Sequence, residues 1–149
     1  MNNQLNQPFQ KKLALLTISI GLLYFYFGML KFFPNLSPAE EIGSVTACKL
    51  CFGLLNEELC LLSLAFLEVM IGVFLIARKH LKFVIVIAIS HLVMTFSPFI
   101  FFPDQIFTES IVTPSLLGQY IYKNIIIICA LIVIYPGKEN KQLSLEVLA

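Results

Sequence analysis

The chain has 149 residues, of which 58% are hydrophobic and only 13% are charged, and its mean hydropathy is +0.88. This composition excludes a soluble globular domain, which needs far more polar surface, and it predicts an integral membrane protein. The formal net charge of +1 gives no basic surface of the kind that binds nucleic acid. At roughly 20 residues per span, the length fits about four membrane-crossing helices joined by short loops.

Four apolar segments are long enough to cross a bilayer as helices. These segments cover residues 13–33, 59–77, 81–102 and 116–135. The first segment runs on without a small-residue cleavage site, so we expect a retained span and not a signal peptide. The sequence therefore predicts an all-α integral membrane domain over 13–135, folded as a four-helix antiparallel bundle between terminal tails at 1–12 and 136–149.

The basic residues predict the orientation of these spans. Seven of them fall on one side of a four-span arrangement: Lys11, Lys12, Arg78, Lys79, Lys82, Lys138 and Lys141. The opposite side carries one lysine and most of the acidic residues: Lys49, Glu40, Glu41, Glu57, Glu58, Asp104 and Glu109. Because basic loops stay in the cytoplasm, both termini and the turn at 78–82 are predicted to be cytoplasmic. The loops at 34–58 and 103–115 are then extracytoplasmic.

The first outer loop contains a signal for a short helix of its own. In "SPAE", Ser37 is a suitable N-cap, Pro38 takes the first helical position and Glu40 completes a capping box. We expect a helix over about 38–52 that lies on the membrane surface. The second outer loop has prolines at both ends and is expected to be mostly irregular.

One ionisable side chain falls in each predicted span: Lys31, Glu68, His91 and Lys123. Each costs on the order of 2–3 kcal/mol at the centre of a membrane helix, so these groups need partners. Residues three, four or seven positions away share a helix face with them and are small or polar, as helix contacts in lipid tend to be: Gly28, Tyr24, Gly72, Thr95, Gln119 and Tyr120. The pattern predicts that the four faces converge, with Glu68 between Lys123 and Lys31 and with His91 below it.

Two interpretations of this polar core remain open. In the first, Glu68 pairs with a lysine and only fixes the register of the helices, while Lys31 extends to the nearby interface. In the second, the core is a polar cavity open to the outside that binds a small anion, a quinone head group or a proton. Two cations and a histidine exceed what one ion pair needs.

The cysteines Cys48, Cys51 and Cys60 fall on the predicted outer side, where disulfides persist in a bacterial periplasm. A redox pair Cys48–Cys51 is one hypothesis, although the predicted helix would begin ten residues before Cys48 and would strain a bond between positions i and i+3. A bridge from Cys60 to Cys48 or to Cys51 is another, and plain packing is a third. No second histidine lies near His91 in the spans, so no metal site is predicted.

Several motifs resemble the DoxX-like family of small bacterial membrane proteins. They are "FGMLKFFPNLSPAEEI", Glu68 in "AFLEVMIGVFL", "TFSPFIFFP" and "TPSLLGQYIYKNIIIICALIVI", which together cover about 20–135. The resemblance implies a four-helix bundle in the bacterial cytoplasmic membrane, related to a thiosulfate:quinone oxidoreductase subunit and to proteins that accompany redox or oxidative-stress systems. It also implies a set of polar core positions: Lys31, Glu68, Gln119, Lys123 and Asn124. The cysteines belong to no motif of that family.

The favoured hypothesis is a non-catalytic subunit or accessory of a periplasm-facing redox or stress-response system, with a bound quinone as the one cofactor considered. Its expected partners are the lipid bilayer and membrane or periplasmic redox proteins, and assembly with a second copy of the chain is open. One alternative is a small proton-coupled transporter that uses Glu68 and His91, although the two halves of the chain show no internal repeat. Another is a membrane thiol–disulfide oxidoreductase that uses Cys48 and Cys51.

Overall fold

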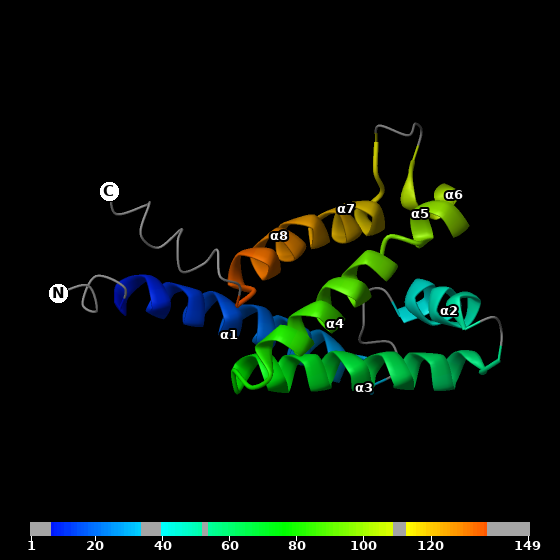
Figure 1. Ribbon diagram of the computed structural model, residues 1–149. Helices are drawn as coiled ribbons and strands as arrows, with labels where there is room; N and C mark the ends of the chain where they lie inside the picture. Colours follow the sequence, from blue (N-terminus) through cyan, green and yellow to red (C-terminus); the bar gives the residue numbers. More distant parts are fainter. Residues whose placement is uncertain (1–6, 34–39, 52–53, 109–112, 137–149) are drawn as a thin grey trace.

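The computed structural model describes residues 7–33, 40–51, 54–108 and 113–136. The described residues are mostly helical and contain no strand beyond one isolated bridge between Phe107 and Pro114. The helices are α1 (Gln7–Leu30), α2 (Glu40–Leu50), α3 (Glu57–Ile76), α4 (Leu81–Met94), α5 (Pro98–Phe101), α6 (Pro103–Ile106), α7 (Leu116–Tyr122) and α8 (Asn124–Ile134). These elements give the part of the chain that is described an all-helical fold, as predicted (Figure 1).

Four helical stretches are long and apolar enough to cross a membrane, which confirms the predicted multi-pass character. They are Gln7–Leu30, Glu57–Ile76, Leu81–Phe101 and Leu116–Ile134. The first begins six residues before the expected start at residue 13, because Lys11 and Lys12 continue the helix as a polar extension and Pro8 is tolerated in a first turn. A helix between the first two spanning stretches is present as α2, whereas its proposed cap at Ser37 and Pro38 lies outside the described residues.

The third spanning stretch is interrupted between α4 and α5. Pro98 has no N–H to donate to the carbonyl of Met94, and the hydroxyl of Ser97 donates to that carbonyl instead, at 2.7 Å. The hydroxyl of Thr95 similarly donates to the Leu92 carbonyl at 2.6 Å. The N–H groups of Ser97 and Thr95 also donate to these two carbonyls, so backbone and hydroxyl donors together keep the oxygens bonded where the chain changes direction.

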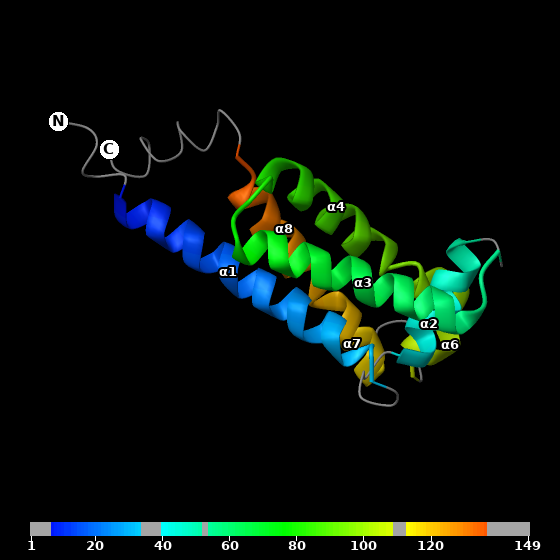
Figure 2. The same ribbon diagram turned by 90° about the horizontal axis from the view of Figure 1, so that it is seen from below.

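α1 and α3 pack closely along their length because glycines let the two backbones approach (Figure 2). A Cβ added at Gly72 would lie 2.6 Å from the backbone nitrogen of Phe25, and one at Gly28 would lie 2.8 Å from that of Val69. Neither position has room for a side chain. Small residues at such contacts are typical of helix pairs in lipid, where close packing replaces the hydrophobic driving force.

The larger cluster of buried apolar side chains lies between α1, α3, α4 and α8, toward the α3–α4 turn, and a smaller one of Ile42, Ile106 and Ile121 joins α2, α6 and α7. We call the larger cluster the packed core; its buried members are Ile20, Tyr24, Ile71, Leu75, Val84, Ile85, Ala88, Leu92, Leu131 and Ile134. Toward their other ends α3 and α4 diverge, and α2 packs there against α3 and α5 (Figure 1). This divergence, with α2 inserted, creates the space that contains the polar side chains.

Candidate functional site

Three helical segments bring Lys31, Glu68 and His91 together. Lys31 follows the C-terminal end of α1, Glu68 lies near the middle of α3, and His91 lies in the last turn of α4. The Nζ atom of Lys31 is 2.5 Å from Oε2 of Glu68, and Nε2 of His91 is 3.4 Å from Oε1 of the same carboxylate. The side chains of Glu68 and Lys31 are about nine-tenths buried. The pairing of Glu68 with Lys31 and its position beside His91 confirm that part of the prediction.

Tyr24 extends this polar cluster toward the packed core. Its hydroxyl donates to the Ala88 carbonyl at 3.1 Å and lies 3.3 Å from Nδ1 of His91. Since the hydroxyl has only one proton, a hydrogen bond with His91 requires that Nδ1–H donates to the tyrosine oxygen. Nε2 then faces Glu68 without a well-aligned hydrogen bond.

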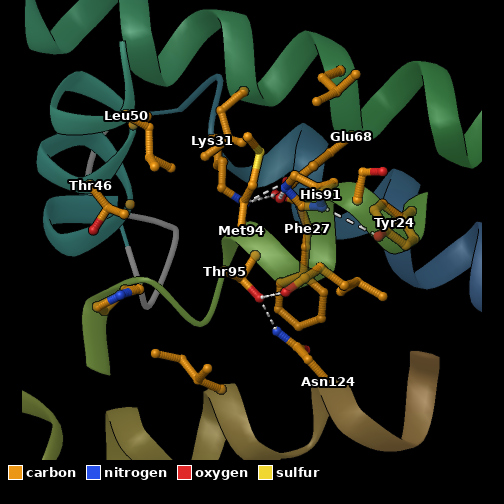
Figure 3. A pocket seen from close by; sticks show the side chains of 18 of the residues that line it. Tyr24, Phe27, Lys31, Thr46, Leu50, Glu68, His91, Met94, Thr95 and Asn124 are labelled. Carbon is orange, nitrogen blue, oxygen red and sulfur yellow. Dashed lines mark hydrogen bonds and ion pairs between the residues drawn. The ribbon is translucent and has the colours of Figure 1, made fainter. Parts of the chain in front are cut away.

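The fourth spanning stretch contributes Asn124 to the space between the helices, whereas the face of Lys123 was expected there. The amide of Asn124 donates to the Thr95 hydroxyl at 2.9 Å, and that hydroxyl donates in turn to the Leu92 carbonyl. Asn124 is buried. Figure 3 shows this contact across the space from the Lys31–Glu68–His91 cluster.

Two predicted members of the polar core lie elsewhere. Lys123 was expected opposite Glu68, but its Nζ lies 3.5 Å from the ring centroid of Tyr120 and 5.3 Å from that of Phe27. The rings give the cation a stabilising contact without a carboxylate. Gln119 is exposed, and its amide donates to the Pro114 carbonyl at 3.3 Å. The rotation of the helix therefore turns Asn124 inward and directs Gln119 and Lys123 away from Glu68.

The polar cluster borders a cavity of about 560 Å³. Its walls are mostly apolar and come from α1, α2, α3, α4, α5, α7 and α8. Figure 3 shows Lys31, Glu68 and His91 directed toward one another, with Thr46 and Leu50 of α2 to the left of them in this view. A cavity of this size and character, with a few convergent polar groups, is typical of a site for a small amphipathic molecule.

Sequence reasoning missed three hydroxyl side chains that line this cavity: Thr46, Ser63 and Ser90. Thr95, four residues after His91, also lines it and was expected from helix periodicity. Thr46 could not be found in this way, because its place depends on how α2 packs. Its hydroxyl is buried and has no hydrogen-bond partner among the described residues.

The cysteines Cys48, Cys51 and Cys60 form a second cluster at the same cavity. Sγ of Cys48 in α2 lies 2.8 Å from Sγ of Cys60 in α3, and both thiols are directed at the Leu55 carbonyl, at 3.4 Å and 3.9 Å. Cys51 lies beside Cys60, and both line the cavity. The structure therefore places Cys48 against Cys60, one of the two pairings to Cys60 that the sequence left open.

Within the described ranges, no group of three or more histidine, cysteine, aspartate or glutamate side chains is arranged to hold a metal ion. The chain matches no known protein-family model, and no curated protein and no solved structure is significantly similar to it. The function therefore has to be argued from the cavity and its side chains.

Proposed function

We propose that this chain is a multi-pass membrane protein that binds the head group of an isoprenoid quinone in the cavity between its helices. The observation that carries the proposal is the position of the Lys31–Glu68–His91 cluster at one side of an otherwise apolar cavity of about 560 Å³. A quinone has an apolar tail and ring with two carbonyl acceptors, so it matches a site with apolar walls and few donors.

The charges of the cluster favour a neutral ligand over a small anion. Lys31 and Glu68 neutralise each other, and His91 carries no full charge in the tautomer that its Tyr24 contact requires. Lys123, the second cation expected near Glu68, is engaged with aromatic rings. The cluster thus has donors but no net positive charge with which to hold an anion in a medium of low dielectric constant.

The membrane arrangement that we propose is an antiparallel four-helix bundle in a bacterial cytoplasmic membrane, with both termini in the cytoplasm. Its support is the distribution of charge: Arg78, Lys79 and Lys82 lie at the α3–α4 turn, and Glu57, Glu58 and Asp104 lie at the end where α2 is found. In this orientation α2 is an interfacial helix on the periplasmic side, and the cavity opens near the outer half of the bilayer.

The resemblance to the DoxX-like family agrees with this proposal. We propose that the protein acts as an accessory or subunit of a redox or stress-response system that faces the periplasm, with a membrane or periplasmic partner carrying out the catalytic step. Lys31, Glu68 and Asn124 are the positions implied by the resemblance that border the cavity. Gln119 and Lys123 are outside its lining, so we assign them no role in binding.

Binding can be tested with the full-length protein in detergent and a short-chain quinone whose ring is fully substituted. We expect the quinone to raise the melting temperature of the wild type in a saturable manner. Glu68→Gln and His91→Leu should weaken that response, because they disrupt the donors at the cavity. Gln119→Leu is the control and should leave it unchanged.

Two results would contradict the proposal. One is a wild type whose melting temperature does not respond to the quinone at saturation of the detergent phase. The other is an equal response in Glu68→Gln, His91→Leu and wild type, which would show that the quinone partitions into the micelle and not into the cavity.

A further inference from the structure

The thiol cluster of α2 and α3 has no part in the proposed quinone contact. Eight residues separate Cys60 from Glu68 along α3, so the thiols lie about 12 Å from the polar cluster, at another part of the cavity wall. Cys60 is buried, Cys48 is half-buried and Cys51 is exposed. The cluster therefore includes a buried thiol in the cavity wall, Cys60, and an exposed thiol that a reagent or partner can reach, Cys51.

The two sulfur atoms of Cys48 and Cys60 are close enough to bond with little movement of the backbone. Their separation of 2.8 Å is less than the sum of two sulfur radii, and both thiols are directed at the same acceptor, the Leu55 carbonyl. Cys48 and Cys60 belong to different helices, so a bond between them avoids the strain of a bond between Cys48 and Cys51 within one helical stretch.

α2 is the wall of the cavity that such a bond would fix. Six positions of this segment, in pairs that repeat about once per helical turn, line the cavity: Ile42, Gly43, Thr46, Ala47, Leu50 and Cys51. α2 has only 11 residues, a length that is marginal for an isolated helix, and its main packing partner is α3. Gly43 has open space around it, where an added Cβ would meet only Leu64 at 3.9 Å. Ile42 belongs to a buried apolar cluster with Ile106 and Ile121, so α2 is held by non-covalent contacts that a bond to α3 would reinforce.

We propose that Cys48 and Cys60 form a reversible disulfide that ties α2 to α3 and closes the cavity around its ligand. The oxidant is a protein or small-molecule disulfide that reacts by thiol–disulfide exchange. One sulfur attacks that disulfide and forms a mixed disulfide, releasing one thiol; the second sulfur then displaces the other thiol. One S–S bond breaks and one forms, and the protons of Cys48 and Cys60 leave on the two released thiols.

The proposed orientation puts this pair on the periplasmic side, where disulfides persist. The consequence for ligand exchange rests on the proposed quinone site, whereas the bond itself can be tested without it. In the reduced protein only non-covalent contacts hold α2 to α3, and the ligand enters and leaves when these contacts open. In the oxidised protein the quinone dissociates severalfold more slowly because the wall can no longer move.

The bond is tested by treating the reduced full-length protein with oxidised glutathione, alkylating the remaining thiols and mapping the cross-linked peptides. We expect a Cys48–Cys60 cross-link in the wild type, in Cys51→Ser and in the control Cys129→Ser. Cys48→Ser and Cys60→Ser should lack it. Cys48→Ser changes a half-buried position and should fold even where Cys60→Ser does not. A cross-link of Cys51 to Cys60 in the wild type, or no cross-link at all, would overturn the pairing.

Closure is tested by the dissociation rate of a short-chain quinone from oxidised and reduced protein. Slower dissociation in the oxidised wild type, with no redox effect in Cys48→Ser, supports the proposal. Equal rates in cross-linked and reduced wild type overturn the closure. If no quinone binds in either state, the proposed function fails, while the peptide map still decides whether Cys48 pairs with Cys60.

Discussion

The two ends of this helical assembly are built from the same helices but are packed in different ways. Toward the α3–α4 turn, glycine contacts bring the backbones of α1 and α3 together, and Leu75, Ile85 and Leu131 are fully buried. Toward α2, the helices diverge and enclose a cavity that contains an ion pair, a histidine and a group of thiols. The comparison suggests that the packed core supplies the stability that a hollow, polar region of the same helices lacks.

The largest effect is expected from adding a side chain at Gly72, where the backbones of α1 and α3 are in contact. Gly72→Leu should prevent α1 and α3 from packing, because even its Cβ would lie 2.6 Å from the Phe25 nitrogen and 2.8 Å from the Gly21 carbonyl oxygen. We expect loss of the folded protein in detergent, measured as the monodisperse fraction after extraction. The control is Gly43→Ala beside the cavity, which should extract like the wild type. If Gly72→Leu also did so, the close approach of α1 and α3 would be wrong.

A smaller effect is expected from truncating leucines at the two ends. Leu75→Ala should lower the free energy of unfolding by about 2 kcal/mol, because a fully buried side chain loses its packing contacts. The loss is at the low end for a buried leucine, because the unfolded state in detergent or lipid also surrounds the side chain with apolar groups. Leu64→Ala, at the cavity wall, should cost well under half as much because fewer atoms surround it. Unfolding followed by circular dichroism in increasing denaturing detergent measures both. Equal losses would mean that the cavity end is as tightly packed as the core.

A similar loss, about 2 kcal/mol, is expected when the ion pair is broken. Lys31→Gln leaves the Glu68 carboxylate buried with only His91 beside it, and a buried charge without its partner is strongly destabilising. Lys123→Gln should have a much smaller effect, since Lys123 contacts rings and no carboxylate of the described chain. Thermal unfolding of Lys31→Gln and Lys123→Gln measures which of the two lysines stabilises the buried Glu68 carboxylate. A larger loss in Lys123→Gln would restore the pairing of Lys123 with Glu68 that the sequence suggested.

The smallest effect concerns the hydrogen bond between Asn124 and Thr95. Thr95→Val removes a hydroxyl that accepts from Asn124 at 2.9 Å and keeps nearly the same shape. We expect a loss of roughly 1 kcal/mol in the free energy of unfolding, the usual contribution of one neutral hydrogen bond. Ser63→Ala, which removes a hydroxyl bound only to the carbonyl one turn before it, is the control and should be near neutral. Equal effects would show that the Asn124 contact contributes nothing specific.

The sequence was sufficient to predict the spans and the Lys31–Glu68 pair for different reasons. Long apolar segments have few alternatives to a membrane helix, and an ionisable residue within one needs a partner on a neighbouring helix. The choice between Lys123 and Asn124 was beyond the sequence, because adjacent residues point about 100° apart and either could face inward. The rotation is fixed by tertiary packing, since Gly118 lies against the carbonyl of Ile106, where a Cβ would have only 2.4 Å.

The thiol pairing shows the same limit at longer range. Cys48 and Cys51 are near in sequence, but a bond between positions i and i+3 of one helical stretch would be strained, and it is Cys60 of α3 that lies 2.8 Å from Cys48. Which cysteine near the end of α2 lies against Cys60 depends on how the chain connects α2 to α3. Local spacing in a sequence contains little information about it.

Tyr24 belongs to both ends of the molecule, since its ring is part of the packed core and its hydroxyl contacts His91. A ligand that draws the His91 ring toward itself must also change the hydrogen bond by which Tyr24 holds the Ala88 carbonyl. Binding and core packing are then thermodynamically coupled, and such coupling is reciprocal. Substitutions deep in the core, far from any ligand atom, should therefore shift the affinity of the cavity, and occupancy of the cavity should slow hydrogen exchange in the helices around Ala88.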